Sequence, residues 1–474
     1  MASLALGLVV LGCRGESTAS PSQTALLPSS SSSAETPPPE PAAPDPAPEA
    51  GPERTPYTPP SSLGSPIATR AAERSRMVYV EPNADSDQRG RIPSGESFHV
   101  YAELDGRGCK RAWAQVGVAA WICLDKTRAS EDTPLTLPSL EDAAIVPFTY
   151  GRHRDHDKAQ TPAIPVYGST QAWREGEAAV EEWPAYGSYA FTRVRRREGH
   201  QLLTTLDRKL VVGDDFELFE PSEFAGLTLA EAPALEGDQV HAWAVRWKSL
   251  VHAEPDPASE SIARIRYHDP LLVAGEVVEV EAEDEADREW IAVVAQGSTP
   301  AGWIRIDNIR RYLPVPPPEP VLAGQVTIDV DLDEQVLSVW LEGEAVFATL
   351  ISSGKQNDRT PTGLYRVTTK RAHGKMSSRE GSSRPYFVEA VPWILYFEGR
   401  YAFHTAYWHD MFGHRMSHGC VNLSPRDAKH VFELSTPALA PGWLLVHEHA
   451  QDPGTLVRIR REGEPLPDRR EPFE

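Results

Sequence analysis

Residues 403–423, FHTAYWHDMFGHRMSHGCVNL, place one cysteine among four histidines, and the interpretation of the whole chain starts from them. Cys420 is the only cysteine in the C-terminal two-thirds of the chain, and His404 precedes it by sixteen positions (420 − 404). A thiol is mostly protonated at neutral pH, so a nucleophilic cysteine needs an imidazole to accept its proton and a third group to orient that imidazole. The stretch therefore predicts a nucleophile and its base.

Two other interpretations of this stretch are open. A single cysteine in an apolar strand is usually a small buried hydrophobic residue, and a nearby histidine is then structural. Zinc binding is the other, because imidazole and thiolate ligands are offered by His404, His409, His414, His418 and Cys420. The stretch lacks a His-Glu-x-x-His helix and a Cys-x-x-Cys pair, and Gly413 and Gly419 interrupt the helical face that such ligands need. We therefore expect no metal and no cofactor.

Residues 417–422, SHGCVN, together with the preceding His404, resemble the signature of the YkuD-type L,D-transpeptidase family. The resemblance extends back through residues 352–355, SSGK, and 360–363, TPTG, and covers about residues 324–449. Carried over residue by residue, it implies that Cys420 is the nucleophile, that His404 is the general base and that the backbone carbonyl of Thr405 orients the imidazole.

The resemblance also implies an oxyanion pocket shaped by His418 and Gly419. The amides of Gly419 and Cys420, with a tyrosine, either Tyr386 or Tyr396, are expected to hold the oxyanion. Substrate contacts are expected from Ser417, Asn422, Tyr386, Tyr396 and Trp408. An acceptor amine is expected beside residues 407–409 and 384–389.

The activity that the resemblance implies is cross-linking of peptidoglycan stem peptides. Cys420 would form a thioester with the third residue of a tetrapeptide stem, release D-alanine and pass the acyl group to an acceptor amine. If water resolves the thioester instead, the protein is an L,D-carboxypeptidase or another hydrolase. A third alternative is a catalytically silent wall-binding protein, against which the intact His404, Gly419 and Cys420 argue.

The composition of the chain limits its partners. Its 474 residues suggest about three domains. The formal net charge of −21 argues against nucleic acid, because phosphate binding needs clustered Lys and Arg. No run of 18 or more apolar residues follows the N-terminus, so we expect no membrane-spanning helix. Separately, we expect the protein to be a monomer.

Residues 1–13, MASLALGLVVLGC, form an apolar run whose end, VLGC, looks like the lipobox of a bacterial lipoprotein signal. Acylation of Cys13 would anchor the protein to a membrane of the cell envelope, in the periplasm. A buried N-terminal strand is the alternative. Residues 14–72 are rich in Pro, Ser and Ala and predict a disordered linker, since they cannot bury enough apolar surface to offset the loss of chain entropy.

Residues 73–127 alternate apolar and polar side chains in short runs, which predicts a small β-barrel that looks SH3-like. In an exported chain, Cys109 and Cys123 are expected to form a disulfide. Similar Trp and Gly patterns predict a second SH3-like domain over residues 260–313. Both domains would bind glycan or peptide, or serve only as spacers whose tryptophans are core residues. Residues 145–250 read as mixed β structure without an assigned function.

The fold class expected is mainly β, with an L,D-transpeptidase-like β-sandwich over residues 321–449. Alternating apolar residues predict antiparallel strands near 326–330, 336–340 and 346–350, and a last strand at 443–447. Ser424, followed by proline and an acid in the first turn, predicts a short helix over residues 425–435, after the cysteine. The charged residues 450–474 are expected to be a solvated tail.

Overall fold

The structure is a computed structural model that describes residues 63–469 apart from 136, 138–139, 141–143, 158–160, 283, 286–287, 319–323, 379–380 and 382–384. The predicted signal with Cys13, the linker up to residue 62 and residues 470–474 lie outside the described residues. Strands dominate the described part and confirm the expected mainly-β class. None of its helices combines the length and the apolar character needed to cross a bilayer.

One layer of the catalytic domain is a six-stranded sheet in the order β16-β26-β25-β24-β33-β27. The predicted strands are confirmed, because β24, β25 and β26 pair antiparallel in sequence. The strands span Leu227–Thr228 (β16), Val326–Asp331 (β24), Val336–Leu341 (β25), Glu344–Leu350 (β26), Gly363–Arg366 (β27) and Leu456–Arg460 (β33).

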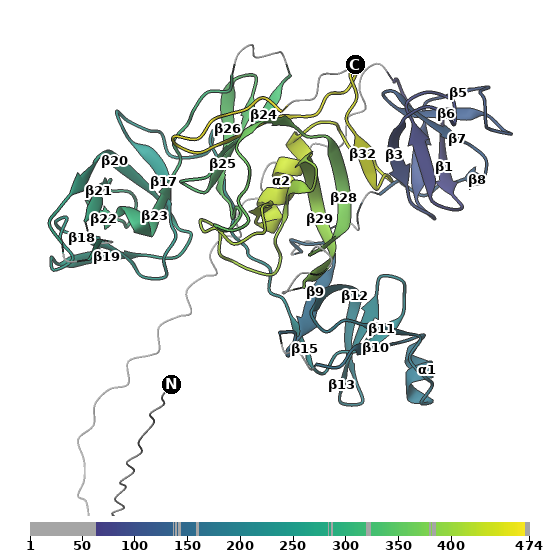
Figure 1. Cartoon of the computed structure of the whole chain (residues 1–474), viewed down its shortest axis with the longest axis horizontal. Coiled ribbons are helices and arrows are strands. Elements are labelled where there is room, and N and C mark those ends of the chain that lie inside the picture. The colour runs from purple at the N-terminus through teal and green to yellow at the C-terminus, as the bar shows by residue number, and fades with distance from the viewer. Residues whose placement is uncertain are drawn as a thin grey trace, which may run out of the picture. The chain divides into compact units, whose positions relative to one another are not determined.

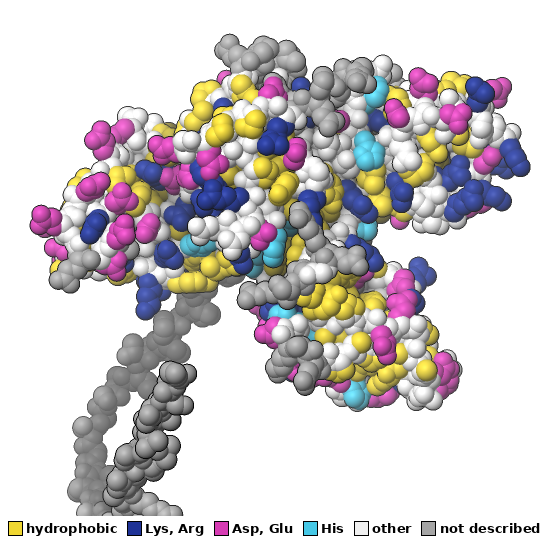
Figure 2. Space-filling view, in the orientation of Figure 1, with side chains coloured by type: hydrophobic (Ala, Val, Ile, Leu, Met, Phe, Trp, Pro, Cys, Tyr) yellow, Lys and Arg dark blue, Asp and Glu magenta, His cyan; other side chains and the backbone are white. Residues whose placement is uncertain are grey.

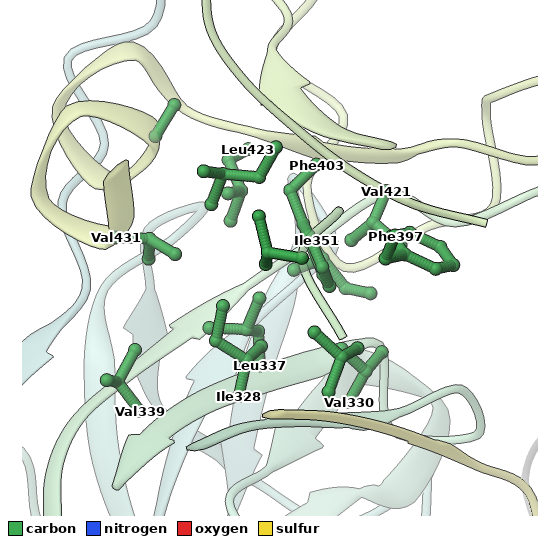
Figure 3. Packing of buried hydrophobic residues seen from close by; sticks show 14 of the residues in the cluster. Ile328, Val330, Leu337, Val339, Ile351, Phe397, Phe403, Val421, Leu423 and Val431 are labelled. Carbon is green, nitrogen blue, oxygen red and sulfur yellow. The ribbon is translucent and has the colours of Figure 1, made fainter. Parts of the chain in front are cut away.

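The second layer runs in the spatial order β32-β28-β29-β30-β31, in which only β30 and β31 pair in parallel. The core between the layers holds Ile328, Val330 and Leu337 from the first sheet, facing Phe397, Phe403 and Val421 from the second (Figure 3). These layers form the expected sandwich. The strands span Thr369–Ser377 (β28), Phe387–Glu398 (β29), Tyr401–Thr405 (β30), Val421–Leu423 (β31) and Leu445–His447 (β32).

The predicted helix is present as α2, Pro425–Leu434, beside β29 in Figure 1. Ser424 caps it by accepting a hydrogen bond from the Asp427 N–H. The Asp427 carboxylate is fully buried and accepts hydrogen bonds from Thr349 Oγ1 at 2.5 Å and from the Gly226 N–H at 2.9 Å. The helix therefore anchors the segment that follows Cys420.

The prediction of a solvated tail over residues 450–474 is wrong for β33, which pairs parallel with β24. Val457 and Ile459 of β33 are buried in the core of the sandwich. Arg458 and Arg460 form ion pairs with Asp329 of β24, and Arg460 also pairs with Asp331. The charges that suggested solvation are therefore neutralised by acids of the neighbouring strand.

The N-terminal module comprises residues 68–129, so its first strand lies within the predicted linker and its last strand passes the predicted end at 127. Apolar alternation in β1 is weak, which explains the misplaced start. The predicted Cys109–Cys123 disulfide is present. Its strands span Ala68–Ala72 (β1), Arg76–Tyr79 (β2), Gln88–Ile92 (β3), Ser97–Val100 (β4), Ala102–Leu104 (β5), Trp113–Gly117 (β6), Ala120–Cys123 (β7) and Thr127–Ala129 (β8).

The region predicted as 145–250 contributes to two modules and, through β16, to the six-stranded sheet described above. The middle module, residues 149–218, has β9 at Thr149–His153, β10 at Ile164–Tyr167, α1 at Thr170–Arg174, β11 at Glu181–Trp183, β12 at Gly187–Arg197, β13 at His200–Thr205, β14 at Leu210–Val212 and β15 at Phe216–Leu218. Strand β12 pairs parallel with β29 of the catalytic domain through Gly187 and Ser188. The middle module is thus joined to the sheet that carries His404.

The third module, residues 240–311, forms a seven-stranded sheet that begins before the predicted boundary at 260. The missed strands are β17 and β18, whose residues had been grouped with the mixed β region. Of the tryptophans in the predicted range 260–313, Trp290 is buried, which is the core role considered for it, whereas Trp303 is partly exposed. Its elements span Val240–Ala244 (β17), Ser249–His252 (β18), Ser261–Ile265 (β19), Pro270–Glu279 (β20), Glu289–Val293 (β21), Gly302–Arg305 (β22), Ile306–Asn308 (η2) and Ile309–Arg311 (β23).

Candidate active site

Two adjacent parallel strands bring the predicted nucleophile and base to one cavity. His404 of β30 lies opposite Asn422 of β31, and Cys420 comes directly before β31. Both His404 and Cys420 line a cavity of about 620 Å³. The pairing of β30 with β31 therefore converts a separation of sixteen positions into a shared site.

The His404 imidazole is held in one orientation. Its Nδ1 donates to the carbonyl of Thr405 at 2.9 Å, which is the contact that the resemblance predicts. Nε2 is then the unprotonated nitrogen, and it accepts a hydrogen bond from Asn422 Nδ2 at 3.1 Å. His404 is only 3% exposed, and this burial lowers its pKa to about 4. The imidazole is therefore neutral near pH 7, and Nε2 can take a proton once the hydrogen bond from Asn422 is released.

Asn422 joins this imidazole to a second one. Its Oδ1 accepts from His409 Nε2 at 3.4 Å, and His409 Nδ1 accepts from the N–H of Met411 at 3.1 Å. Each of these hydrogen bonds joins a donor to an acceptor when both histidines are neutral. Both ends of the Asn422 amide are engaged by histidines, so Asn422 positions them. Asn422 also lines the cavity, and its predicted contact with substrate stays a prediction. The sequence carried no signal for the contribution of His409.

The Cys420 thiol is free of disulfides and partly exposed. Its Sγ donates to the carbonyl of Arg400 at 3.7 Å. Burial raises the pKa of the thiol, so the thiol and the imidazole both lack charge at neutral pH. Catalytic hydrogen bonds often tighten only when substrate binds, so this resting contact is compatible with proton transfer to His404.

The turn before Cys420 depends on glycine and serine. Gly419 has a φ of +111°, and a Cβ there would lie 2.5 Å from Cε1 of Tyr401. Its N–H donates to Ser417 Oγ at 3.0 Å, and that hydroxyl donates to the Cys420 carbonyl at 2.5 Å. The Gly419 amide and the Ser417 hydroxyl therefore both form hydrogen bonds within the turn. Ser417 also lines the cavity, and the oxyanion and substrate contacts expected of these two residues stay predictions.

The earlier segments of the resemblance support the same turn. Thr360 Oγ1 donates to the carbonyl of Gly419 at 2.8 Å and accepts from the N–H of Gly354 at 3.0 Å. A Cβ on Gly354 would lie 2.0 Å from the Asp358 carbonyl oxygen. The buried Gly354 and Thr360 of these segments thus support the turn at Gly419, whereas residues 355–359 between them are exposed.

Aromatic side chains form much of the cavity wall. Tyr386, Tyr396 and Trp408 all line it, as expected, and the Tyr386 ring stacks on His418 with a centroid distance of 5.0 Å. Burial raises the pKa of Tyr386 and of Tyr396, so both phenols keep their protons and can donate hydrogen bonds. Residue 384, the first of one expected acceptor segment, lies outside the described residues.

The loop between His404 and Cys420 is held by the third module. His414 Nε2 donates to the carbonyl of Val245 at 2.7 Å, and Arg310 Nε donates to the carbonyl of Gly413 at 3.1 Å. Ring nitrogens of three of the four histidines in residues 403–423, namely His404, His409 and His414, thus form hydrogen bonds within the protein.

Sequence reasoning missed one side of the cavity. Arg152, His156, Tyr186 and Ser188 of the middle module line it together with the catalytic residues. The Tyr150 hydroxyl donates to the carbonyl of Ala390 at 2.9 Å, which fixes this module against β29. No local motif marks these residues, because their role depends on contacts made more than two hundred positions away.

Comparison with known proteins agrees with this geometry. Residues 325–459 match the YkuD family model, described as the L,D-transpeptidase catalytic domain, and this range includes β33. Residues 325–459 therefore form a YkuD-type domain. The match does not extend to the N-terminal, middle or third module. No curated protein matches the chain.

Solved L,D-transpeptidase structures are similar to part of the chain. A variant of the Enterococcus faecium enzyme is 24% identical over 29% of this chain and 50% of its own, with a TM-score of 0.23. The Mycobacterium smegmatis enzyme is 18% identical over 36% of this chain and 66% of its own, with a TM-score of 0.24. The isolated E. faecium catalytic domain is 23% identical over 29% of this chain and 98% of its own, with a TM-score of 0.23. The chain thus spans half to two-thirds of the length of the first two.

Proposed function

We propose that the protein is a cysteine acyltransferase of the cell envelope that cross-links peptidoglycan by L,D-transpeptidation. One observation carries the proposal: Cys420 and a neutral His404, oriented by the Thr405 carbonyl, share a single cavity within a YkuD-type domain. A partly exposed thiol that shares a cavity with an oriented imidazole suits acyl transfer through a covalent intermediate.

In the first half-reaction, Sγ of Cys420 attacks the carbonyl of the third residue of a tetrapeptide stem, and its proton passes to His404 Nε2. A carbon–sulfur bond forms, and the bond to the nitrogen of the terminal D-alanine breaks. The His404 imidazolium returns the proton to that nitrogen, so D-alanine leaves as the free amine. The Cys420 amide and the phenol of Tyr386 or Tyr396 are the proposed donors to the oxyanion.

In the second half-reaction, an amine of another stem attacks the thioester. His404 takes a proton from the attacking nitrogen, the carbon–sulfur bond breaks, and the proton returns to Sγ. An amine held beside the thioester has an effective molarity of about 10⁵ M or more in well-oriented systems, which exceeds that of water at about 55 M. Transfer to an amine is therefore favoured over hydrolysis.

Attachment to the envelope is part of the proposal. The segment VLGC ending at Cys13 supports an N-terminal lipid anchor, and the N-terminal and third modules are proposed to be SH3-like domains. Replacement of Cys13 by serine should move the protein from the membrane fraction to the soluble periplasmic fraction. A wild-type protein that is already soluble in the periplasm would contradict the anchor.

Product analysis tests the reaction. The purified protein is incubated with disaccharide-tetrapeptide, and the products are resolved by mass. A dimer that lacks one D-alanine is the expected product, and His404→Ala should not form it. If the wild type forms only monomeric tripeptide, the protein is an L,D-carboxypeptidase and transpeptidation is excluded.

A further inference from the structure

The middle module supplies one wall of the cavity, and this module packs tightly against the catalytic domain. Tyr150 is 1% exposed, and its ring stacks on Tyr407 with a centroid distance of 3.6 Å. Tyr407 in turn donates from its hydroxyl to the carbonyl of Glu389 at 3.0 Å. A single hydrophobic cluster contains Tyr150 and Ala190 of the module together with Val391 of β29. The positions of the module's residues at the cavity are therefore fixed by close packing in a shared core.

The charge of the cavity differs from that of the chain. Among the described residues that line it are three permanent cations, Arg152, Lys375 and Arg400, and no Asp or Glu. The whole chain has a net charge of −21, and acidic and basic side chains are interspersed over the face that Figure 2 shows. A cavity lined by one sign of charge attracts ligands of the opposite sign.

Arg152 lines this wall, and its guanidinium is only partly engaged by its own module. Its Nη2 lies 3.4 Å from Glu217 Oε2, and its guanidinium carbon lies 5.3 Å from the centroid of the Phe219 ring. Its Nε is buried and has no hydrogen-bond partner within the part of the chain that the structure describes. The Arg152 side chain as a whole is 34% exposed, and a carboxylate is the group that a guanidinium binds best.

We propose that Arg152 of the middle module binds a carboxylate of the substrate peptide and makes the enzyme selective for acidic over amidated stems. Lys375 and Arg400 add to the same attraction from the catalytic domain. The inference rests on the proposed function for the identity of the peptide. A residue outside the catalytic domain then sets which stems reach Cys420.

The experiment measures binding in a variant that cannot react. Cys420→Ala protein is titrated calorimetrically with disaccharide-tetrapeptide and with the same compound in which each carboxylate is converted, one at a time, to a carboxamide. The titrations are repeated after adding Arg152→Gln, Arg152→Lys or Arg193→Gln. Arg193 is the matched control, because it is exposed on β12 of the same module and does not line the cavity.

At one carboxylate, the acid should bind about ten- to a hundredfold more tightly than the amide, as expected for a hydrogen bond to a charged group. Arg152→Gln should abolish this preference, Arg152→Lys should retain part of it, and Arg193→Gln should leave it unchanged. Equal binding of acid and amide, or a preference that survives Arg152→Gln, would overturn the proposal. Failure of transpeptidation would show as absent dimer in the wild type, which this binding measurement does not require.

Discussion

The N-terminal and middle modules attach to the catalytic domain in the same manner but reach different places. Strand β3 of the N-terminal module pairs with β32, and Trp443 of the catalytic domain completes that module's core. Strand β12 of the middle module pairs with β29, and Tyr150 packs in a core shared with the catalytic domain. Of the two, only the middle module lines the cavity that contains Cys420. Strand pairing therefore serves stability where the N-terminal module attaches at β32, and substrate selection where the middle module attaches at β29.

The largest effect is expected from His404→Ala. His404 is the proposed general base, and it belongs to the catalytic domain and not to either of the two modules. Removal of a general base should lower the rate of thioester formation by about 10²- to 10⁴-fold. Rapid quenching followed by intact mass measures that rate. His200→Gln is the control, since His200 is an exposed histidine of the middle module that pairs with Asp214. A similar loss in both variants would show that the effect is not one of base catalysis.

Trp443→Ala should separate stability from selectivity. Trp443 is 3% exposed, and its removal should lower the free energy of unfolding by about 3–5 kcal/mol in denaturant titrations. The ratio of kcat/KM for acidic and amidated stems should not change. Trp247→Ala, at a side chain that is 64% exposed, should change stability by less than about 0.5 kcal/mol. If Trp443→Ala alters the ratio, the N-terminal module also acts on the cavity.

The pH dependence of stability should reveal the buried imidazole of the site. Burial lowers the pKa of His404 to about 4 in the folded protein, from an ordinary value of 6.5. Between these values the unfolded state binds more protons, so this histidine makes stability fall as the pH drops from 6.5 to 4. Its contribution to the slope is at most about 1.4 kcal/mol per pH unit.

Denaturant titrations at several pH values measure that slope. In His404→Asn the slope should correspond to up to one fewer proton taken up on unfolding. Other histidines with a lowered pKa, such as His373, should still contribute to the slope as in the wild type. An unchanged slope in the variant would mean that His404 is not held neutral by burial.

The smallest effect is expected from Tyr150→Phe, which removes the hydrogen bond to the Ala390 carbonyl. The loss of stability should be about 1 kcal/mol, and the preference for acidic stems should weaken because the wall is held less firmly. Tyr189→Phe is the matched control, because the Tyr189 hydroxyl donates to the Pro184 carbonyl within the same module. A loss of preference in the control but not in Tyr150→Phe would contradict the proposed role of this contact.

The parts of the fold that could be predicted were those that depend on local sequence. Alternating apolar residues identified β24, β25 and β26, and the cap at Ser424 identified α2. Strand β33 could not be identified, because Arg458 and Arg460 find their acidic partners about 130 positions earlier, on β24. From sequence alone, a charged strand cannot be distinguished from a solvated tail when its oppositely charged partners lie far away in the chain.

The same distinction applies to the site. The spacing of His404 and Cys420 and the turn before Cys420 could be predicted from adjacent residues. The engagement of the Gly419 amide by Ser417 and the path from His409 through Asn422 to His404 required the side-chain orientations that the fold fixes. Arg152 required the docking of a module whose own sequence carries no catalytic motif.

The identity of the residue that forms the acyl-enzyme can be measured most directly by trapping that intermediate. The wild-type protein is mixed with disaccharide-tetrapeptide, quenched in acid and digested, and the adduct is located by mass. We predict an acyl group lacking D-alanine on the peptide that contains Cys420, with one D-alanine released for each adduct. An adduct on any other residue, or release of D-alanine that continues undiminished in Cys420→Ala, would contradict the assignment of Cys420 as the nucleophile.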